Sequence, residues 1–498
     1  MGSIQSSGRG SLKIRWTGRV ESSKTVFMNP DESPARWPIS FFSSRSTVIA
    51  LAGLLAFHAV FVFAADPPAQ GTRKSPDWLR SSVVYEIFPR NFSKEGDLNA
   101  ITARLDDLKE LGVDILWLMP IHPVGEKMKK GTYGSPFAVR DFYAINPDYG
   151  NTNDFKRLID EAHQRHMKLI MDIVAGQTSW DSVLMEHPDF YKKDTNGTII
   201  PPNPAWTDVA GVNYDNPEVR RYMTDMMKYW LRDYGVDGFR CDVAPTVPVD
   251  FWEAARDELQ KINPEVIVLA DAGARPELLS KAFDVDSSWG FVYTLDQVMS
   301  GTVPFAYLQE SWQHTYQQYP AGALHLRFSD NHEQTRAVAR HGLEGALAEQ
   351  VLMLMLDGVP LFYNGMEAGD ATESIDPALF EKMPVFWHAG GRPPLRSIYR
   401  DLIKLRKQYP AFSSGDVAWL TNSATEQVVS LQRKDQKDEF VVLINLTSHR
   451  ATGTVELPDA EGFEPVKISI RPGPGEPVLP GFNLNSYEWF IYHRTPPK

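Results

Sequence analysis

Three carboxylates and one arginine lie at the ends of apolar, strand-like segments, where they could carry out acid–base chemistry. Asp242 follows Arg240 by two residues in VDGFRCD, so both side chains project from the same face of a strand. Asp271 ends VIVLAD, and Glu333 ends SDNHE. Glycoside hydrolysis needs one carboxylate that attacks and one that protonates the leaving oxygen, about 5 Å apart when configuration is retained. A neighbouring arginine would keep the attacking carboxylate ionised.

Further polar and aromatic residues come at the end of an apolar, strand-like segment or in the loop after it. They are Phe137, Asp141, Asp172, Gln177, Asn331 and His332. A single acid at a strand end equally serves as a cap, and Arg240 with Asp242 alone equally forms a structural ion pair. Three acidic strand ends together favour a catalytic site. Their spacing alone leaves other barrel hydrolases and a metal-using isomerase open.

The segments that must position these residues alternate between strand and helix. Strands are predicted at 82–88, 113–119, 167–174, 236–242, 266–271, near 291–295, 323–330 and 359–364. Helices are predicted after Asp97, over 153–166, from Asn216 to Trp230, over 250–262 and over 396–408. The pattern predicts an α/β fold, a (β/α)₈ TIM barrel over 78–415 with a long loop insertion after strand 3 at 175–215. Short strands without helices then predict a C-terminal antiparallel β-sandwich over 416–498.

Composition narrows the class of protein. The 498 residues are 43% hydrophobic and 23% charged, as in ordinary globular proteins, and the net charge is −12. An acidic balance argues against a nucleic-acid partner, because phosphate binding requires a basic face. Cys241 is the single cysteine, so an intrachain disulfide framework is excluded. No cofactor is expected.

The first part of the chain differs from the rest. Residues 1–46 are basic and rich in Ser, which predicts disorder, and 66–77 read as a linker. Between them, 47–65 is an apolar run that fits either a signal peptide or a membrane anchor. Both interpretations predict an exported protein, with the barrel outside the cytoplasm and possible membrane attachment through 47–65.

Four motifs carry a family resemblance. ELGVDILWLMPIHPV, DGFRCDVA, RFSDNHEQTR and GVPLFYNGMEAG occur in this order. Together they resemble the α-amylase family of retaining glycoside hydrolases, glycoside hydrolase family 13, over about residues 82–410. The resemblance implies an enzyme that acts on α-glucans or maltooligosaccharides. Asp242 matches the family's nucleophile, Asp271 its acid/base and Glu333 its transition-state stabiliser. The residues matched to substrate binding are Phe137, Asp141, Gln177, Arg240, Asn331 and His332.

The chain departs from the family pattern at five places in this site. The family normally has Glu at 271, Asp at 333, Tyr at 137, Asn-His at 176–177 and often Lys-His at 245–246; here these are Asp271, Glu333, Phe137, Gly176-Gln177 and Pro245-Thr246. Each Asp/Glu exchange moves a carboxyl group by about 1.5 Å, and a misplacement of about 1 Å can cost on the order of 100-fold in rate. Activity is therefore expected to be reduced or altered. Gly176 lacks the side-chain oxygen that ligates calcium in many relatives, so that metal is not predicted.

Two other functions stay open at this level. The first is a non-catalytic α-glucan-binding protein on the same fold, favoured by the clustering of the departures in one pocket. The second is a membrane-anchored partner subunit, because a basic tail, one apolar span and an amylase-like domain resemble the heavy chains of heteromeric amino-acid transporters. Those chains link to their partner through a cysteine just outside the membrane, and none occurs between 66 and 240.

Overall fold

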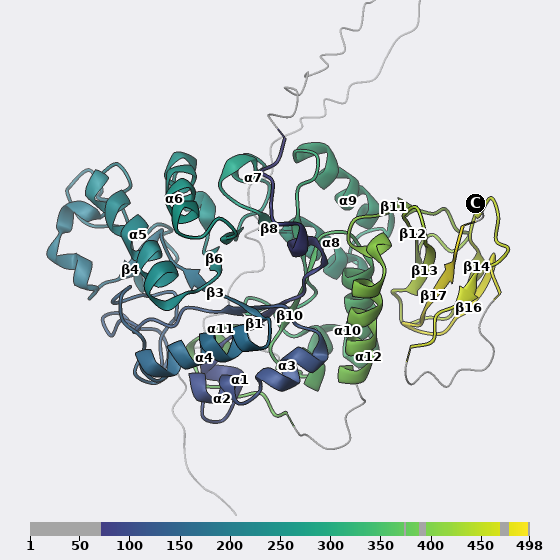
Figure 1. The fold of residues 1–498 in the computed structure, drawn as a ribbon, viewed down its shortest axis with the longest axis horizontal. Helices are drawn as coiled ribbons and strands as arrows, with labels where there is room; N and C mark the ends of the chain where they lie inside the picture. Colours follow the sequence, from purple (N-terminus) through teal and green to yellow (C-terminus); the bar gives the residue numbers. More distant parts are fainter. Residues whose placement is uncertain (1–70, 373–374, 388–394, 469–477, 497–498) are drawn as a thin grey trace, which may run out of the picture. The chain divides into compact units, whose positions relative to one another are not determined.

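The computed structural model describes residues 71–372, 375–387, 395–468 and 478–496. The predictions for 1–46 and 47–65 lie outside these ranges. Eight parallel strands close into a barrel in the order β1, β2, β3, β6, β7, β8, β9 and β10 (Figure 1). They are β1 (Val84–Ile87), β2 (Ile115–Leu118), β3 (Lys168–Ile173), β6 (Gly238–Cys241), β7 (Ile267–Ala270), β8 (Val285–Ser287), β9 (His325–Arg327) and β10 (Val359–Tyr363). The predicted TIM barrel is confirmed.

Alternation along the strands separates a packed barrel interior from the site above it. Val84, Ile115 and Ile170 belong to one buried apolar cluster. Two residues further along the same strands, on the same face, stand Glu86, Trp117 and Asp172, each buried. In β6 the same step leads from Gly238 to Arg240. In β1, β3 and β6 the inward face therefore ends in a charged residue toward the carboxyl end of the strand, where barrel active sites form.

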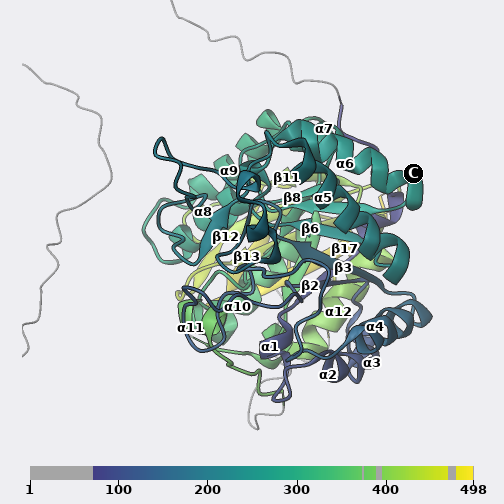
Figure 2. The ribbon, with the colours of Figure 1, turned by 90° about the vertical axis from the view of Figure 1, so that its left-hand side faces the viewer.

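Helices surround the strands (Figures 1 and 2). They are α1 (Pro89–Phe92), α2 (Leu98–Thr102), α3 (Leu105–Leu111), α4 (Thr152–Gln164), α5 (Pro217–Tyr229), α6 (Val249–Ile262), α7 (Leu278–Lys281), α8 (Trp289–Met299), α9 (Ala306–Gln318), α10 (Ala337–Met355), α11 (Ile375–Phe380) and α12 (Leu395–Gln408). Asp97 caps α2 through Ala100 N at 2.8 Å, and Asn216 caps α5 through Glu218 N at 2.9 Å, as their sequence positions predict. No helix within the described ranges has the length and apolar character needed to cross a membrane.

The strand predicted near 291–295 is wrong, because these residues lie in α8. The sixth barrel strand is instead β8, which is three residues long and contains Asp286 and Ser287. Phe291, Val292, Leu295 and Val298 are buried along α8, a spacing that belongs to a helix and not to a strand. The apolar run FVYTL concealed that period, while the short polar β8 gave no strand signal.

The insertion after β3 contains a small antiparallel pair, β4 (Gln177–Ser179) and β5 (Val209–Gly211). The C-terminal part forms two antiparallel sheets (Figure 1). Their strands are β11 (Asp416–Trp419), β12 (Val428–Lys434), β13 (Glu439–Asn445), β17 (Trp489–Arg494) and β15 (Glu464–Pro465) in one sheet, and β14 (Ala451–Thr454) and β16 (Gly481–Leu484) in the other. Leu443 of the first sheet and Leu484 of the second share one apolar core, as a sandwich requires.

The close packing of β6 against β7 leaves no room for a side chain at Gly238. A β-carbon at Gly238 would lie 2.0 Å from the carbonyl oxygen of Ile267, which is backbone and cannot rotate away. We expect Gly238→Ala to destabilise the protein by about 3 kcal/mol or more. Gly290→Ala is the control, since no atom lies within 4 Å of its β-carbon position. Urea unfolding midpoints measure both, and equal midpoints for the two variants would contradict this packing.

Candidate active site

Arg240 lies between three carboxylates at the carboxyl end of the barrel. Its Nη1 donates to both oxygens of Asp172, at 3.0 and 2.9 Å, and to Oδ1 of Asp242 at 2.8 Å. Its Nη2 lies 2.8 Å from Oδ2 of Asp271. The guanidinium carbon is 5.0 Å from the ring centroid of Trp117. One buried cation thus connects the ends of three neighbouring strands, β3, β6 and β7.

Burial and an excess of negative over positive charge together set the directions of the pKa shifts in the cluster. Burial raises the pKa of Asp172 to about 6 and that of Asp242 to about 8, although the charge of Arg240 opposes both shifts. The charges of Asp172 and Asp271 add to the shift at Asp242. Burial acts to lower the pKa of Arg240, but the surrounding carboxylates raise it well above its ordinary value. Arg240 therefore stays charged, and Asp242 is the carboxylate that ionises with difficulty.

His332 joins a second pair of acids to this cluster. Its Nδ1 pairs with Oε1 of Glu86, and its Nε2 lies 3.5 Å from Oε1 of Glu333. Burial acts to lower the pKa of His332, but the charges of Glu86 and Glu333 reverse this and raise it to about 10. Desolvation acts to raise the pKa of Glu333, yet the contact with His332 lowers it. The imidazole therefore carries a proton and keeps Glu333 as a carboxylate.

Phe137 and Asn331 complete the predicted group around His332. The ring of Phe137 stacks on His332, with centroids 5.3 Å apart and planes at 30°, and is 8% exposed. Asn331 accepts a hydrogen bond from the backbone N of Glu333 at 3.0 Å, which fixes the turn that presents the acid. The side chain of Glu333 is 41% exposed, so it reaches the solvent side of the site. The structure thus gathers Phe137, Asn331, His332 and Glu333 next to Arg240.

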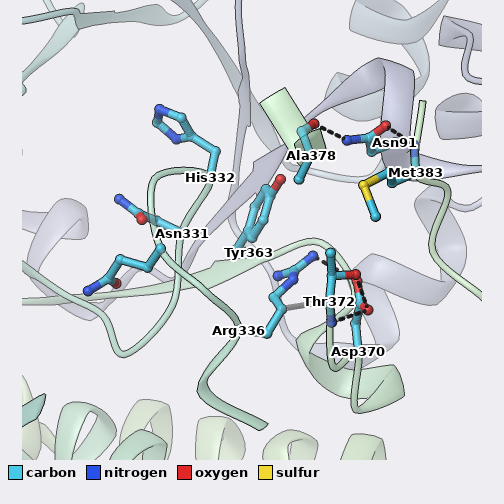
Figure 3. A pocket seen from close by; sticks show the side chains of 10 residues that line it. Asn91, Asn331, His332, Arg336, Tyr363, Asp370, Thr372, Ala378 and Met383 are labelled. Carbon is cyan, nitrogen blue, oxygen red and sulfur yellow. Dashed lines mark hydrogen bonds and ion pairs between the residues drawn. The ribbon is translucent and has the colours of Figure 1, made fainter. Parts of the chain in front are cut away.

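A small polar pocket opens beside Asn331 and His332 (Figure 3). Arg336 lines its far side, pairs with Asp370 at 3.1 Å and lies 4.0 Å over the ring of Tyr363. The residues lining the pocket come from α1, from the loop after β9, from the end of β10 and the loop after it, and from α11 and the segment that follows α11. The pocket has a volume of about 20 Å³, which holds one water molecule and is too small for a sugar ring.

Comparison with known sequences identifies the family. The profile of the family described as Alpha amylase, catalytic domain, matches residues 38–198 and 205–451, more than half of the chain. The chain belongs to the α-amylase family. It is similar to Alpha-amylase MalA of Haloarcula japonica, with 30% identity over 421 residues, which cover 81% of this chain and 60% of that protein. It is also 30% identical to a trehalose-6-phosphate hydrolase of Bacillus subtilis over 60% of this chain and 66% of that protein.

The chain therefore spans less than two thirds of the length of these two relatives. Solved structures of the α-amylase family match it over their whole length. A noncanonic maltogenic α-amylase, AmyB, from Thermotoga neapolitana superposes with a TM-score of 0.75 and 28% identity, covering 84% of this chain and 100% of that chain. An α-amylase from Lactobacillus plantarum gives 0.73 and 29%, covering 83% and 99%.

Asp271 is the most consequential departure from the α-amylase family pattern. Its Oδ2 contacts Arg240 at 2.8 Å and accepts from the backbone N of Val243 at 3.3 Å. Its Oδ1 accepts from Nε1 of Trp289 at 2.9 Å. The short side chain is thus drawn toward the arginine, and both of its oxygens are engaged.

Two other departures from the α-amylase pattern compensate one another. A β-carbon at Gly176 would lie 2.4 Å from Oγ1 of Thr246, so the threonine occupies the space that a side chain at position 176 would need. Thr246 Oγ1 donates to the carbonyl of Val243 at 2.8 Å, directly after the predicted nucleophile. The residues present do not fit a calcium ion at this place, because Gly176 has no side-chain ligand and the room for one is filled.

Gln177 and Asp141 are placed differently from the other predicted substrate-binding residues. Gln177 begins β4 and is 7% exposed, with its strand paired to β5 in the insertion. Asp141 accepts from the backbone N of Tyr143 at 2.9 Å, and its charge raises the pKa of Tyr143 and opposes the lowering of the pKa of His122. Contact of either residue with a sugar stays a prediction.

Sequence reasoning missed Glu86, Trp117 and Trp289. Glu86 had a readable signal, since it is the one charged residue within the apolar strand SVVYEIF and a lone charge on an inward face needs a partner. Trp117 stands in an apolar strand, where a core role was the simpler interpretation. Trp289 was hidden by the misplaced sixth strand at 291–295, which placed Trp289 before a strand, whereas it follows β8 directly at the start of α8.

The excess of buried negative charge leads to a prediction about the stability of two variants. Arg240→Met leaves three buried carboxylates without their cation and is expected to cost about 3–5 kcal/mol of unfolding free energy. The folded-state pKa of Asp242, about 8, lies above the unfolded value of about 3.9, so at pH 7 the carboxylate must take up a proton on folding, which opposes folding. Asp242→Asn removes that cost, and we expect its Tm at pH 7 to equal or exceed that of the wild type. A Tm for Asp242→Asn as low as that for Arg240→Met would contradict this balance of charges.

Proposed function

We propose that the protein hydrolyses α-glucosidic bonds in α-glucans or maltooligosaccharides with retention of configuration. The observation that carries this proposal is the placement of Asp242 and Asp271 on one guanidinium, each 2.8 Å from a nitrogen of Arg240. Two carboxylates so close together are what a retaining double displacement requires. The family and its structural relatives named as α-amylases support the same activity.

In this proposal each residue acts on a defined atom. The reacting sugar lies against Phe137, near His332. Asp242 attacks the anomeric carbon while Asp271 gives a proton to the leaving oxygen, so the glycosidic bond breaks and a glycosyl–Asp242 ester forms. Water then attacks the same carbon, Asp271 takes its proton, and Asp242 is released. Glu333, held ionised by His332, stabilises the positive charge that develops on the sugar ring.

A second candidate is an α-glucan-binding protein without turnover. The engagement of both Asp271 oxygens by Arg240, Val243 N and Trp289 favours it, because an acid catalyst must carry a proton toward the leaving oxygen. Asp271 and Glu333 stand where the family normally has Glu and Asp, and this exchange also favours a binding protein. The two candidates differ in product release and agree in sugar binding.

Export by way of 47–65 is proposed on the apolar character of that segment alone. Sequencing the N-terminus of the protein recovered outside the cytoplasm would locate any cleavage, and recovery of the protein in the cytoplasm alone would refute export.

The test is release of glucose or maltose from maltooligosaccharides by the purified protein, with Asp242→Asn as the blank. We expect release by the wild type and none above background by Asp242→Asn. Asp271→Asn should lose this activity by at least about 100-fold yet keep most turnover of an α-glycosyl fluoride, whose leaving group needs little protonation. Binding of maltooligosaccharide by a folded wild type that releases no product would instead establish the binding protein.

The raised pKa of Asp242 predicts an unusual pH dependence. Attack requires the carboxylate form, so activity is lost as the pH falls through the folded-state pKa, about 8 in the free protein. We expect the acid limb of the kcat/KM profile to lie well above pH 5, since kcat/KM reports groups in the free enzyme. Arg165→Lys on the protein surface serves as the control profile. An acid limb near pH 4 would show that Asp242 ionises as an ordinary aspartate.

A further inference from the structure

The turn that follows Asp242 has an unusual backbone. Val243 adopts a left-handed conformation, with φ 39° and ψ 51°. A β-branched residue rarely takes this conformation, because its side chain crowds the backbone there, so surrounding contacts must hold the turn in place. The residues that follow, Ala244–Thr246, form one turn of 3-10 helix. The strained residue is therefore directly next to the predicted nucleophile, where a change of backbone would move the carboxylate.

Hydrogen bonds hold this turn from several sides. The carbonyl oxygen of Val243 accepts from the backbone N of Thr246 at 2.9 Å and from its Oγ1 at 2.8 Å. The backbone N of Ala244 donates to the carbonyl oxygen of Asp271 at 3.0 Å. The carbonyl oxygen of Ala244 accepts from Nε1 of Trp252 in α6 at 3.0 Å. The turn thus joins the end of β6 to the end of β7, and the Thr246 hydroxyl closes it.

Gly176, at the base of the insertion, leaves room for that hydroxyl. A β-carbon at Gly176 would lie 2.4 Å from Oγ1 of Thr246, and the next atoms, Cβ of Thr246 and Cγ2 of Val247, would be at 3.4 and 3.9 Å. Gly176 does not have the left-handed φ that favours glycine, so its backbone does not require this residue. The requirement is space for one oxygen atom. A side chain at position 176 would turn the Thr246 hydroxyl away from the carbonyl of Val243.

We propose that Thr246 is a positioning residue for the nucleophile: its hydroxyl holds the strained turn after Asp242, and Gly176 provides the space that the hydroxyl needs. This role rests on the proposed hydrolase function. Attack on the anomeric carbon requires the carboxylate at a defined distance and angle, and a misplacement of about 1 Å can cost on the order of 100-fold in rate. The backbone N of Asp242 donates to the carbonyl oxygen of Ile173 at 2.9 Å, which fixes the strand side. The turn fixes the other side, so the position of the carboxylate depends on it.

Substitutions at Thr246 test the hydroxyl. Thr246→Val keeps the shape of the side chain and removes the hydrogen bond, whereas Thr246→Ser keeps the hydroxyl. We expect kcat for maltoheptaose to fall about tenfold in Thr246→Val with KM within about twofold, and to stay within about threefold of the wild type in Thr246→Ser. The rate at which a 5-fluoro-α-glycosyl fluoride labels Asp242 should follow the same order, because it reports the attack itself.

Thr102→Val is the matched control. Thr102 Oγ1 donates to the carbonyl oxygen of Leu98 at 2.9 Å within α2, which contributes no residue to the site, so its loss should leave kcat and labelling unchanged. A merely structural role would lower the unfolding midpoint of Thr246→Val without separating its kcat from that of Thr246→Ser. Equal rates for these two variants would overturn the positioning role.

A double-mutant cycle with Gly176 separates crowding from loss of the hydroxyl. Gly176→Ala should lower kcat by about as much as Thr246→Val, because its β-carbon displaces the hydroxyl. In a Thr246→Ala background, Gly176→Ala should have no further effect on kcat, since the oxygen is gone and Cβ of residue 246 lies at an ordinary contact distance of 3.4 Å. Additive losses would show that each residue acts alone, and would overturn the pairing.

Amide exchange tests the hold on the turn without turnover. Hydrogen–deuterium exchange of the peptide spanning 242–247, read by mass spectrometry, should be about tenfold faster in Thr246→Val and unchanged in Thr246→Ser. Equal exchange in the wild type and Thr246→Val would overturn the hold. A wild type that neither releases product nor takes the label would refute the proposed function and with it the effect on attack, whereas faster exchange in Thr246→Val would still support the hold on the turn.

Discussion

The site depends on one buried guanidinium. Arg240 is 2% exposed and contacts Asp172, Asp242 and Asp271, which end three adjacent strands of the barrel. Without a cation at this point, three carboxylates could not be buried together, because burying an unpaired charge costs several kcal/mol per ion. Burial raises the pKa of Asp242, and the surplus negative charge of the cluster adds to this shift. In the proposed hydrolysis, this surplus stabilises the positive charge that develops on the sugar ring.

A second cluster of charged residues, formed by Glu86, His332 and Glu333, lies next to the Arg240 cluster. Glu86 and Glu333 hold His332 protonated, and His332 in turn supports the ring of Phe137. Strand alternation explains why Glu86 and Arg240 point to the same space, since each stands two residues beyond an interior position of its strand. Two departures from the α-amylase pattern are each accompanied by a neighbouring residue that compensates for the change. Thr246 fills the space left by Gly176, and Trp289 supports an acid that is one methylene shorter than the family's.

Much of the fold could be read from the sequence. Seven barrel strands were placed correctly because they are apolar runs bounded by capped helices, as at Asn216 and Asp97. The strand β8 could not be read, since three residues that include an aspartate carry no period. The convergence of Asp242 and Asp271 on Arg240 was predictable because the strand ends of a barrel converge, and their catalytic role stays a prediction. Trp289 was not, because its place beside Asp271 depends on where α8 begins and on contacts between segments that are distant in sequence.

The most direct measurement of the central claim is covalent trapping of the nucleophile. A 5-fluoro-α-glycosyl fluoride slows breakdown of the glycosyl–enzyme ester, so the labelled peptide can be identified by mass spectrometry after proteolysis. Retaining hydrolysis through Asp242 predicts a single labelled peptide that contains Asp242, and its loss in Asp242→Asn. A label on Asp172 or Asp271, or no label on a folded protein that binds maltooligosaccharide, would contradict it.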